Sequence, residues 1–366
     1  MSTGLLVIYA ASIALIGVIA VLLPNFSRPT LAFGVRIPPE QVDSEFVTEQ
    51  RRWYQRWVLA GCAALLAVQL PLALAVPEFV QYGLSTLPVV VVAGAVYYRA
   101  HSRIRAAKRQ QGWYDSARQG IAVDTSLRSD PERFPWLWVL PAIVVLAITA
   151  VIGILRYPSM PDILVLHWSG SGEPDRTAPK SPGSAFVLVF VQAGLTAFLV
   201  VLTRLCFGAK PELDPARPRG SARQHRRFST RTAKAMLVLT AASGFTMLGA
   251  ALMVWWNSFS VPLLLLSLLP VAIGVVGLLV LSVRTGQGGS KLEQEADVAE
   301  NTGYVEQDDD RFWLAAGLFY VNRDDPAVFV QKRVGFGWTV NLANPKAWLL
   351  FVGLIGIAVL PALLLP

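Results

Sequence analysis

The sequence predicts an all-α integral membrane bundle of about eight transmembrane helices, with a small cytoplasmic β-rich module before the last helix. Of its 366 residues, 54% are hydrophobic and only 15% are charged, whereas about 25% is usual for charged residues in a soluble domain. The mean hydropathy is +0.49. Charged residues are also concentrated in short stretches between long apolar runs. This pattern is typical of a chain whose main solvent is lipid.

Eight apolar runs are long enough to be spans. A bilayer core of ~30 Å requires about 20 apolar residues in a helix. The runs that meet this requirement are residues 4–24, 57–76, 83–99, 136–155, 184–206, 235–256, 261–283 and 347–365. Very short connections join the second run to the third and the sixth to the seventh, so each of these pairs is expected to form an antiparallel helical hairpin.

The distribution of Lys and Arg predicts the orientation. Segments 25–56, 99–134, 207–234 and 284–346 hold 5, 8, 8 and 7 of these residues, which is 28 of the 32 in the chain. Since cytoplasmic loops carry the excess of Lys and Arg, these segments are predicted to be cytoplasmic. We therefore expect a multi-pass protein of the cell membrane with both termini extracytoplasmic. The same bias explains the net charge of +8, so no nucleic-acid partner is expected.

Five parts follow from this reading. They are an N-terminal membrane region of three spans (1–134), a membrane domain of four spans (135–283), an acidic flexible linker (284–310), a small β-rich cytoplasmic module (311–345) and the last span (346–366). The linker starts with Gly-Gln-Gly-Gly-Ser and ends with three Asp, which favours a disordered spacer. The module has aromatic and β-branched residues around an Asn-Arg-Asp-Asp-Pro turn signal, which predicts a hairpin or three-stranded unit.

Two further charged stretches have simple interpretations. The basic, proline-rich stretch 207–234 is expected to be a solvated linker near anionic headgroups. The acidic run at 308–310 does not have the spacing of a calcium loop, so no metal is expected there.

The sizeable outside loop carries the candidate ligand-binding residues His167, Trp168, Gly172 and Asp175. Residues 163–168 suit a short extended segment and residues 169–172 suit a turn, which would bring Asp175 back towards His167. A carboxylate in that position would hold the imidazole in one tautomer, and Trp168 would be an aromatic anchor for a ligand or peptide. The alternative is a structural turn with Trp168 in the interfacial aromatic belt.

A second motif precedes the second span on the cytoplasmic side. It reads Phe-Gly-Val-Arg-Ile-Pro, and its candidate residues are Gly34, Arg36 and Pro38. The guanidinium fork of Arg36 could bind a phosphate or a carboxylate. The alternative is contact with lipid headgroups or with a neighbouring loop carboxylate such as Glu40.

Three strings in the chain resemble known families. PDILVLHWSGSGEPDR resembles the signature of a bacterial membrane domain of unknown function found in SdpI-type immunity proteins, a resemblance that covers roughly residues 136–206. The string from Phe33 to Pro38 is similar to the Gly-Ile-Arg-Thr-Pro string of the same group, although Ile37 replaces Thr and the string precedes the His-Trp loop instead of following it. The string from Asp308 to Pro345 looks like another small uncharacterised bacterial domain.

These observations lead to a functional expectation. The sequence has no HExxH, P-loop or GxSxG motif, and its three histidines are scattered, so neither an enzyme nor a cofactor is expected. The resemblance implies a role in immunity to a membrane-active peptide or in signal transmission. Expected partners are the lipid bilayer, an extracytoplasmic peptide and a cytoplasmic regulatory protein. The alternative is a transporter or permease for a small apolar or lipid-like substrate, since proline interrupts several spans of an uncharged bundle.

Overall fold

A computed structural model describes residues 3–72, 78–169, 172–293 and 300–364. Within these residues the chain is mostly helical, and a long helix overlaps each of the eight predicted apolar runs. These helices are α1 (Thr3–Phe26), α2 (Glu45–Leu72), α3 (Glu78–Gln110), α5 (Leu140–Arg156), α6 (Pro182–Phe207), α7 (Pro218–Trp256), α8 (Val261–Thr285) and α9 (Pro345–Leu364). A short helix, α4 (Ser126–Ser129), lies in the connection before α5.

Among the described residues, four helical segments are long and apolar enough to cross a membrane. They are Trp136–Ser159, Pro182–Phe207, Pro218–Trp256 and Val261–Gly289. The apolar parts of α1 and α9 are shorter in the part of the chain that was searched, at Ile13–Phe26 and Pro345–Leu360. Several helices of this length and composition indicate a membrane protein.

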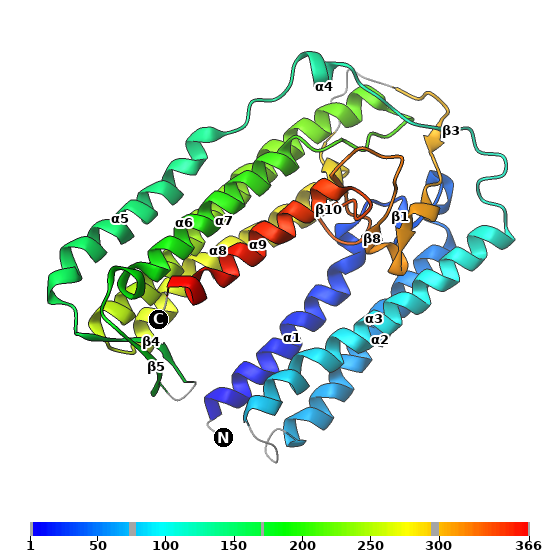
Figure 1. Cartoon of the computed structure of the whole chain (residues 1–366). Coiled ribbons are helices and arrows are strands. Elements are labelled where there is room, and N and C mark those ends of the chain that lie inside the picture. The colour runs from blue at the N-terminus through cyan, green and yellow to red at the C-terminus, as the bar shows by residue number, and fades with distance from the viewer. Residues whose placement is uncertain (1–2, 73–77, 170–171, 294–299, 365–366) are drawn as a thin grey trace.

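The long helices form two groups (Figure 1). The N-terminal group contains α1, α2 and α3, which pack against one another. In the C-terminal group α7 packs against α5, α6 and α8, while α9 packs against α6. The groups diverge towards the end where both termini lie and converge at the opposite end in a non-helical region (Figure 1). We call this region the cap; it comprises the described residues of 27–44, 111–134, 208–217 and 286–344.

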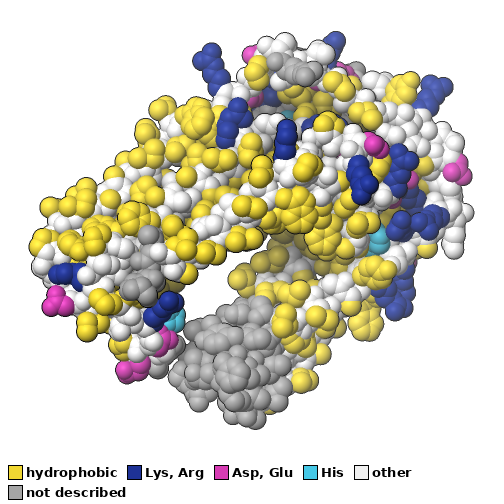
Figure 2. Space-filling view, in the orientation of Figure 1, with side chains coloured by type: hydrophobic (Ala, Val, Ile, Leu, Met, Phe, Trp, Pro, Cys, Tyr) yellow, Lys and Arg dark blue, Asp and Glu magenta, His cyan; other side chains and the backbone are white. Residues whose placement is uncertain are grey.

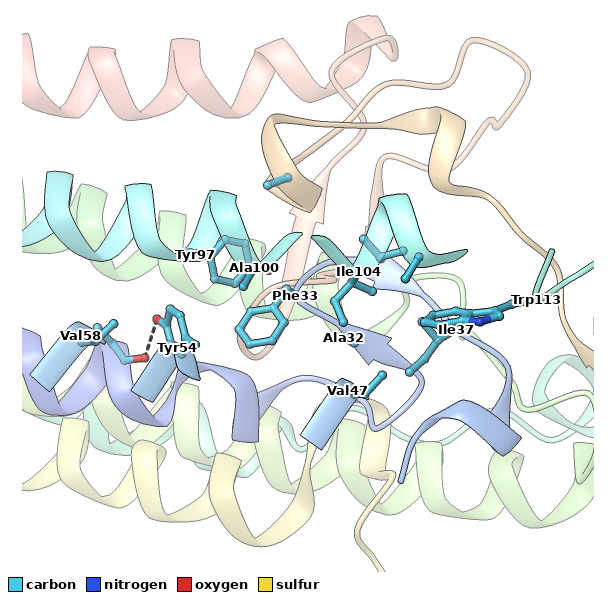
Figure 3. Close-up of a cluster of buried hydrophobic side chains, with 14 of the residues drawn as sticks. Ala32, Phe33, Ile37, Val47, Tyr54, Val58, Tyr97, Ala100, Ile104 and Trp113 are labelled. Carbon is cyan, nitrogen blue, oxygen red and sulfur yellow. Dashed lines mark hydrogen bonds between the residues drawn. The ribbon is translucent and has the colours of Figure 1, made fainter. Parts of the chain in front are cut away.

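A buried aromatic cluster joins the N-terminal group to the cap. Tyr54 on α2 donates its hydroxyl hydrogen to the carbonyl oxygen of Ala20 on α1, at 2.8 Å. Phe33, from the loop after α1, packs edge-on against Tyr54 and Tyr97, with ring centroids 5.2 and 5.6 Å away (Figure 3). All four side chains are at most 8% exposed, so the loop after α1 is part of the hydrophobic core.

Short two-stranded sheets make up much of the cap. The strands are β1 (Leu31–Ala32), β2 (Val35–Arg36), β3 (Gln119–Gly120), β6 (Val305–Glu306), β7 (Trp313–Leu314), β8 (Phe319–Tyr320), β9 (Phe329–Gln331) and β10 (Trp338–Val340). β1 pairs with β2, β7 with β8 and β9 with β10, all antiparallel, and β3 pairs with β6 in parallel. The β3–β6 pair joins the segment after α3 to the segment before the last helix.

The expected hairpin around the Asn-Arg-Asp-Asp-Pro signal is not observed. That signal lies between β8 and β9, which do not pair with each other; each pairs with a strand on its other side. The side chain of Asn341 holds this connection instead. Its amide donates to the carbonyl oxygens of Asn322 and Asp325, at 2.8 and 3.0 Å, and its oxygen accepts from the Asn322 backbone N–H. A buried amide therefore supplies the hydrogen bonds that a ladder partner would have given.

The two stretches expected to be linkers are more structured than their composition suggests. In 284–310, a 3-10 turn at Gln287–Gly289 is buried, and the acidic residues after 305 form ion pairs; residues 294–299 lie outside the described part. In 207–234, α7 starts at Pro218 and buries His225 and Phe228. Both differences arise because these polar stretches pack against each other and against the N-terminal group.

Candidate functional site

The loop between α5 and α6 forms a β-hairpin, β4 (Ile163–Trp168) and β5 (Pro174–Pro179). It is joined to the bundle through Asn257, which ends α7 in a left-handed conformation with φ of 52°. The Asn257 side-chain oxygen accepts from the Val165 N–H at 2.6 Å, and its amide donates to the Ile163 carbonyl oxygen at 2.8 Å. Leu164 is buried against the helices. The hairpin is therefore fixed on the turn between α7 and α8.

The hairpin brings His167 and Asp175 together, as the sequence predicted. The Nδ1 atom of His167 lies 2.6 Å from Oδ1 of Asp175. The two side chains are 66% and 46% exposed. Register shifts on either side of His167 alter the regular pairing, so that His167 lies opposite Arg176 and Trp168 opposite Pro174. Such irregularities redirect side chains at functional sites.

Trp168 and Gly172 have structural contacts with the turn that precedes α8. The Trp168 ring lies 6.2 Å from the ring of Phe259. Gly172 has φ of +85°, which favours glycine, and a Cβ there would lie 3.0 Å from the Phe259 ring. Phe259 therefore supports both residues, and neither residue is aimed freely into solvent. Residues 170–171, at the tip of the turn, lie outside the described part.

This geometry gives the hairpin a defined hydrogen-bonding surface. A carboxylate that accepts from Nδ1 requires a proton on that atom, so Nε2 of the neutral ring becomes an acceptor. Both groups are exposed, and Trp168 supplies an aromatic surface next to them in the chain. The arrangement suits recognition of a ligand with an N–H or ammonium donor next to an apolar group.

The motif from Phe33 to Pro38 is buried in the cap. Gly34 has φ of +77°, and a Cβ at this position would collide with the carbonyl oxygen of Ala316. Gly317 packs on the other side of the contact, where its own Cβ would lie 3.0 Å from the Gly34 Cα. Pro38 is also buried and precedes a 3-10 turn. The motif thus allows two backbone segments, far apart in the sequence, to approach closely.

Arg36 binds carboxylates, but not that of the neighbouring Glu40. Its guanidinium contacts Glu212, lies 2.7 Å from Glu306 and lies 2.7 Å from Asp309. Its side chain is only 4% exposed. Glu40 is not among these partners. The guanidinium fork therefore joins the loop after α1 to two distant segments of the cap.

Three other buried cations complete the ionic cluster. Arg28 lies 3.0 Å from Glu306, Lys108 lies 2.7 Å from Asp310 and 2.8 Å from Asp308, and Arg333 contacts Asp309 and Asp310. Arg28, Lys108 and Arg333 have side chains 9%, 8% and 1% exposed. We call these three cations, Arg36 and the carboxylates that they contact the ionic cluster.

Charge pairing outweighs burial in the cluster. Burial alone would raise the pKa of Asp310, but Arg333 and Lys108 hold that pKa below its usual range. Burial likewise opposes ionisation of Glu306, and Arg36 and Arg28 reverse the effect, so the pKa of Glu306 is also lowered. Glu306 and Asp310 are therefore ionised at neutral pH and hold the cations by both charge and hydrogen bonds. No group of three or more potential metal ligands was found among the described residues.

A cavity of about 900 Å³ opens beside the ionic cluster. Its walls include Arg36 from the loop after α1, Phe207 and His225 from the C-terminal group, and Trp313 and Tyr320 from the module. Because both the cap and the C-terminal group contribute to its walls, a movement of one relative to the other would change its shape.

Sequence reasoning found the hairpin pair but missed the ionic cluster. His167 and Asp175 are eight residues apart in the sequence, so turn chemistry alone places them together. Arg36 and Asp309 are separated by 273 residues, and nothing in one sequence links them. The available signal was the unusual density of carboxylates in residues 306–310, within a chain whose long segments between apolar runs are mostly basic.

Two family models match the chain, each over a short part. Residues 144–193, which include the hairpin, match a domain of unknown function (DUF1648), and residues 323–348, in the cap and the start of α9, match a family of unknown function (DUF5808). The resemblance to two uncharacterised domains is thereby confirmed. No curated protein and no solved structure matches the chain.

Proposed function

We propose that this chain is a non-enzymatic bacterial membrane protein that binds a membrane-active peptide through the β4–β5 hairpin, in immunity to that peptide or in transmitting its presence. The exposed pair of His167 and Asp175, held 2.6 Å apart on a hairpin fixed to the bundle, carries the proposal. Preorganised polar groups beside an aromatic side chain reduce the entropic cost of binding. Membrane-active peptides are commonly basic and amphipathic, and such peptides offer both ammonium donors and apolar groups.

The proposal includes eight transmembrane spans with both termini and the hairpin on the extracytoplasmic side. The start of α1 and the end of α9 lie at the same end of the molecule as β4 and β5 (Figure 1). The cap, at the opposite end, and the helix ends that adjoin it contain the four segments with 28 of the 32 Lys and Arg residues, which favours a cytoplasmic cap. There, the cavity at the ionic cluster would be the region open to a cytoplasmic regulatory protein.

Binding by matched variants tests the proposal. Purified protein in lipid nanodiscs is titrated with a panel of cationic amphipathic peptides, and His167→Ala and Asp175→Asn are compared with the unaltered protein. We expect about tenfold weaker binding in each variant, because hydrogen bonds to charged groups contribute ~1.5–3 kcal/mol. Asp162→Asn is the control, since Asp162 is an exposed carboxylate in the same loop, 3.9 Å from Lys180.

The corresponding cellular experiment uses the same variants. Cells producing the unaltered chain should tolerate a bound peptide better than cells lacking it, and the His167→Ala variant should lose this protection. Equal binding by all variants, or unchanged peptide sensitivity and unchanged transcription in cells lacking the chain, would contradict the proposal.

A second candidate is a transporter or permease for a small apolar or lipid-like substrate. Figure 2 shows an opening between the two helical groups, with hydrophobic side chains along its walls. The α8 side chains Leu265, Leu266 and Ile273 are 62%, 66% and 63% exposed. The test is the movement of a fluorescent lipid between leaflets of proteoliposomes; a rate equal to that of protein-free vesicles rules out this candidate for that lipid.

A further inference from the structure

The β7–β8 hairpin of the cap has an apolar outer face. Trp313 and Tyr320 form one cross-strand pair, with ring centroids 5.0 Å apart, and both are buried. Leu314 and Phe319 form the other cross-strand pair and are 54% and 50% exposed. Leu318, in the connecting turn, is 52% exposed. Surface strands in water usually place polar residues on the outer face, so this face requires an explanation.

The turn between these strands is held rigidly. Ala315, Ala316 and Gly317 all have positive φ, at 48°, 58° and 89°, and non-glycine residues adopt such values only where the surrounding structure enforces them. Ala316 and Gly317 pack directly on Gly34. The apolar outer face is therefore a fixed projection of the cap.

Its position along the bundle can be assigned from α3. The turn packs on Gly34, next to Phe33, and Phe33 packs on Tyr97 and accepts a hydrogen bond at its carbonyl oxygen from His101, at 2.8 Å. The hairpin thus lies level with the α3 residues at which the predicted third span ends, at 99. Figure 1 shows β8 beside the end of α3 that enters the cap.

Residues typical of a membrane interface occur at the same level. Tyr98 is 62% exposed, and the guanidinium groups of Arg99 and Arg103 lie 5.9 and 4.9 Å from the Trp53 ring. Aromatic and basic residues are enriched where a bilayer meets water. In the 3-10 turn that precedes the hairpin, Arg311 adds a cation 4.6 Å from the Phe312 ring.

We infer that Leu314, Leu318 and Phe319 insert into the cytoplasmic leaflet, so that the cap rests on an anionic bilayer surface. The apolar face continues the lipid-facing surface of α3, and the surrounding cations suit anionic headgroups. The inference does not depend on the proposed peptide binding.

The test uses full-length protein, one copy per nanodisc, in bilayers of phosphatidylglycerol and phosphatidylcholine. Cys62 and Cys206 are replaced by Ser, and a single cysteine introduced by Leu318→Cys carries a fluorophore. Two quenchers are compared, a nitroxide attached to lipid near the headgroup and iodide in water. The control label is placed by Tyr304→Cys, because Tyr304 is 48% exposed in the cap beside β3.

We expect the label at 318 to be quenched by the lipid nitroxide and to be about tenfold less sensitive to iodide than the label at 304. Adding Leu314→Ser and Phe319→Ser should increase iodide quenching at 318 and leave the label at 304 unchanged, provided that the variant remains monodisperse. Equal iodide quenching at 318 and 304 would overturn the inference. Protection from both quenchers would overturn it as well, because a protein surface would then cover the face.

Discussion

Replacing Arg333 by Met should weaken the attachment of the loop after α1 to the module within the cap. The Arg333 side chain is 1% exposed; it contacts Asp309 and Asp310 and donates to the Gly34 carbonyl oxygen at 2.9 Å. Removing one partner of a buried ion pair costs about 3–5 kcal/mol. After this substitution Asp309 would still pair with Arg36, and Asp310 would still pair with Lys108; both ion pairs have distances of 2.7 Å. Because each carboxylate retains one cation, we expect the lower end of the range, about 3 kcal/mol.

Thiol labelling at position 27 measures this change. Ser27 is 7% exposed, and its hydroxyl oxygen accepts from the Gly335 N–H at 3.3 Å, so Ser27→Cys places a thiol between the N-terminal group and the module. In a background with Cys62→Ser and Cys206→Ser, the labelling rate follows the population of the opened cap. A cost of about 3 kcal/mol should raise that rate about 100-fold, since every 1.4 kcal/mol is a factor of ten.

The control is an exposed ion pair in the same region. The ammonium of Lys210 lies 3.8 Å from Asp325, and the Lys210 side chain is 63% exposed. Such a pair contributes less than about 1 kcal/mol, so Lys210→Met should change the labelling rate less than about fivefold. The ionic cluster does not hold the loop after α1 to the module if Arg333→Met labels no faster than Lys210→Met.

Three further predictions concern the cap and the outer hairpin. The pKa of Asp310 is lowered in the folded chain. Its contribution to stability is therefore present above the usual Asp pKa of about 4 and is lost as pH falls through the lowered value. Hydrogen exchange of the module, corrected for intrinsic rates, should increase on acidification, and this increase should be smaller in the Asp310→Asn variant. Gly34→Ala should destabilise the cap by more than about 1 kcal/mol, because the added Cβ would collide with backbone atoms. The control, Gly335→Ala, should destabilise the protein less, because Gly335 has φ of +82° but only a side-chain atom 3.8 Å from the added Cβ. Equal shifts in melting temperature for the two variants would contradict this reasoning. Asn257→Gly keeps the left-handed turn but leaves the Val165 N–H without its acceptor. Hydrogen exchange in the β4–β5 hairpin should therefore rise by about tenfold. Unchanged exchange would show that Asn257 does not hold this hairpin.

The helices and the outer hairpin could be predicted because their signals are local. A run of about 20 apolar residues favours a membrane-length helix by itself; a helix was found at each of the eight runs, and four helical segments among the described residues are long and apolar enough to cross a membrane. The hairpin follows from an extended segment, a turn and Pro174, all within one loop. The proximity of His167 and Asp175 depends only on that turn.

The cap could not be predicted because its partners are distant. Asp308, Asp309 and Asp310 have the composition of a disordered spacer when taken alone, and they become fixed by pairing with Lys108, Arg36 and Arg333. The module was predicted to contain strands, but their pairing was placed at the wrong turn. The side chain of Asn341 decides that arrangement by tertiary hydrogen bonds, which local propensity does not record.

The long sequence separation within the ionic cluster also has a consequence for biosynthesis. Arg333 and Gly34 are 299 residues apart, and ribosomes add about 5–20 residues per second. The first three helices therefore wait on the order of tens of seconds before their final partner is synthesised. Arg28 and Arg36 gain Glu212 first and only later Glu306 and Asp309, so the charge pairing of the newly made N-terminal region is completed late in synthesis. A chain that ended before residue 306 would lack most carboxylates of the ionic cluster, so the loop after α1 would lack the ion pairs that fix it in the cap.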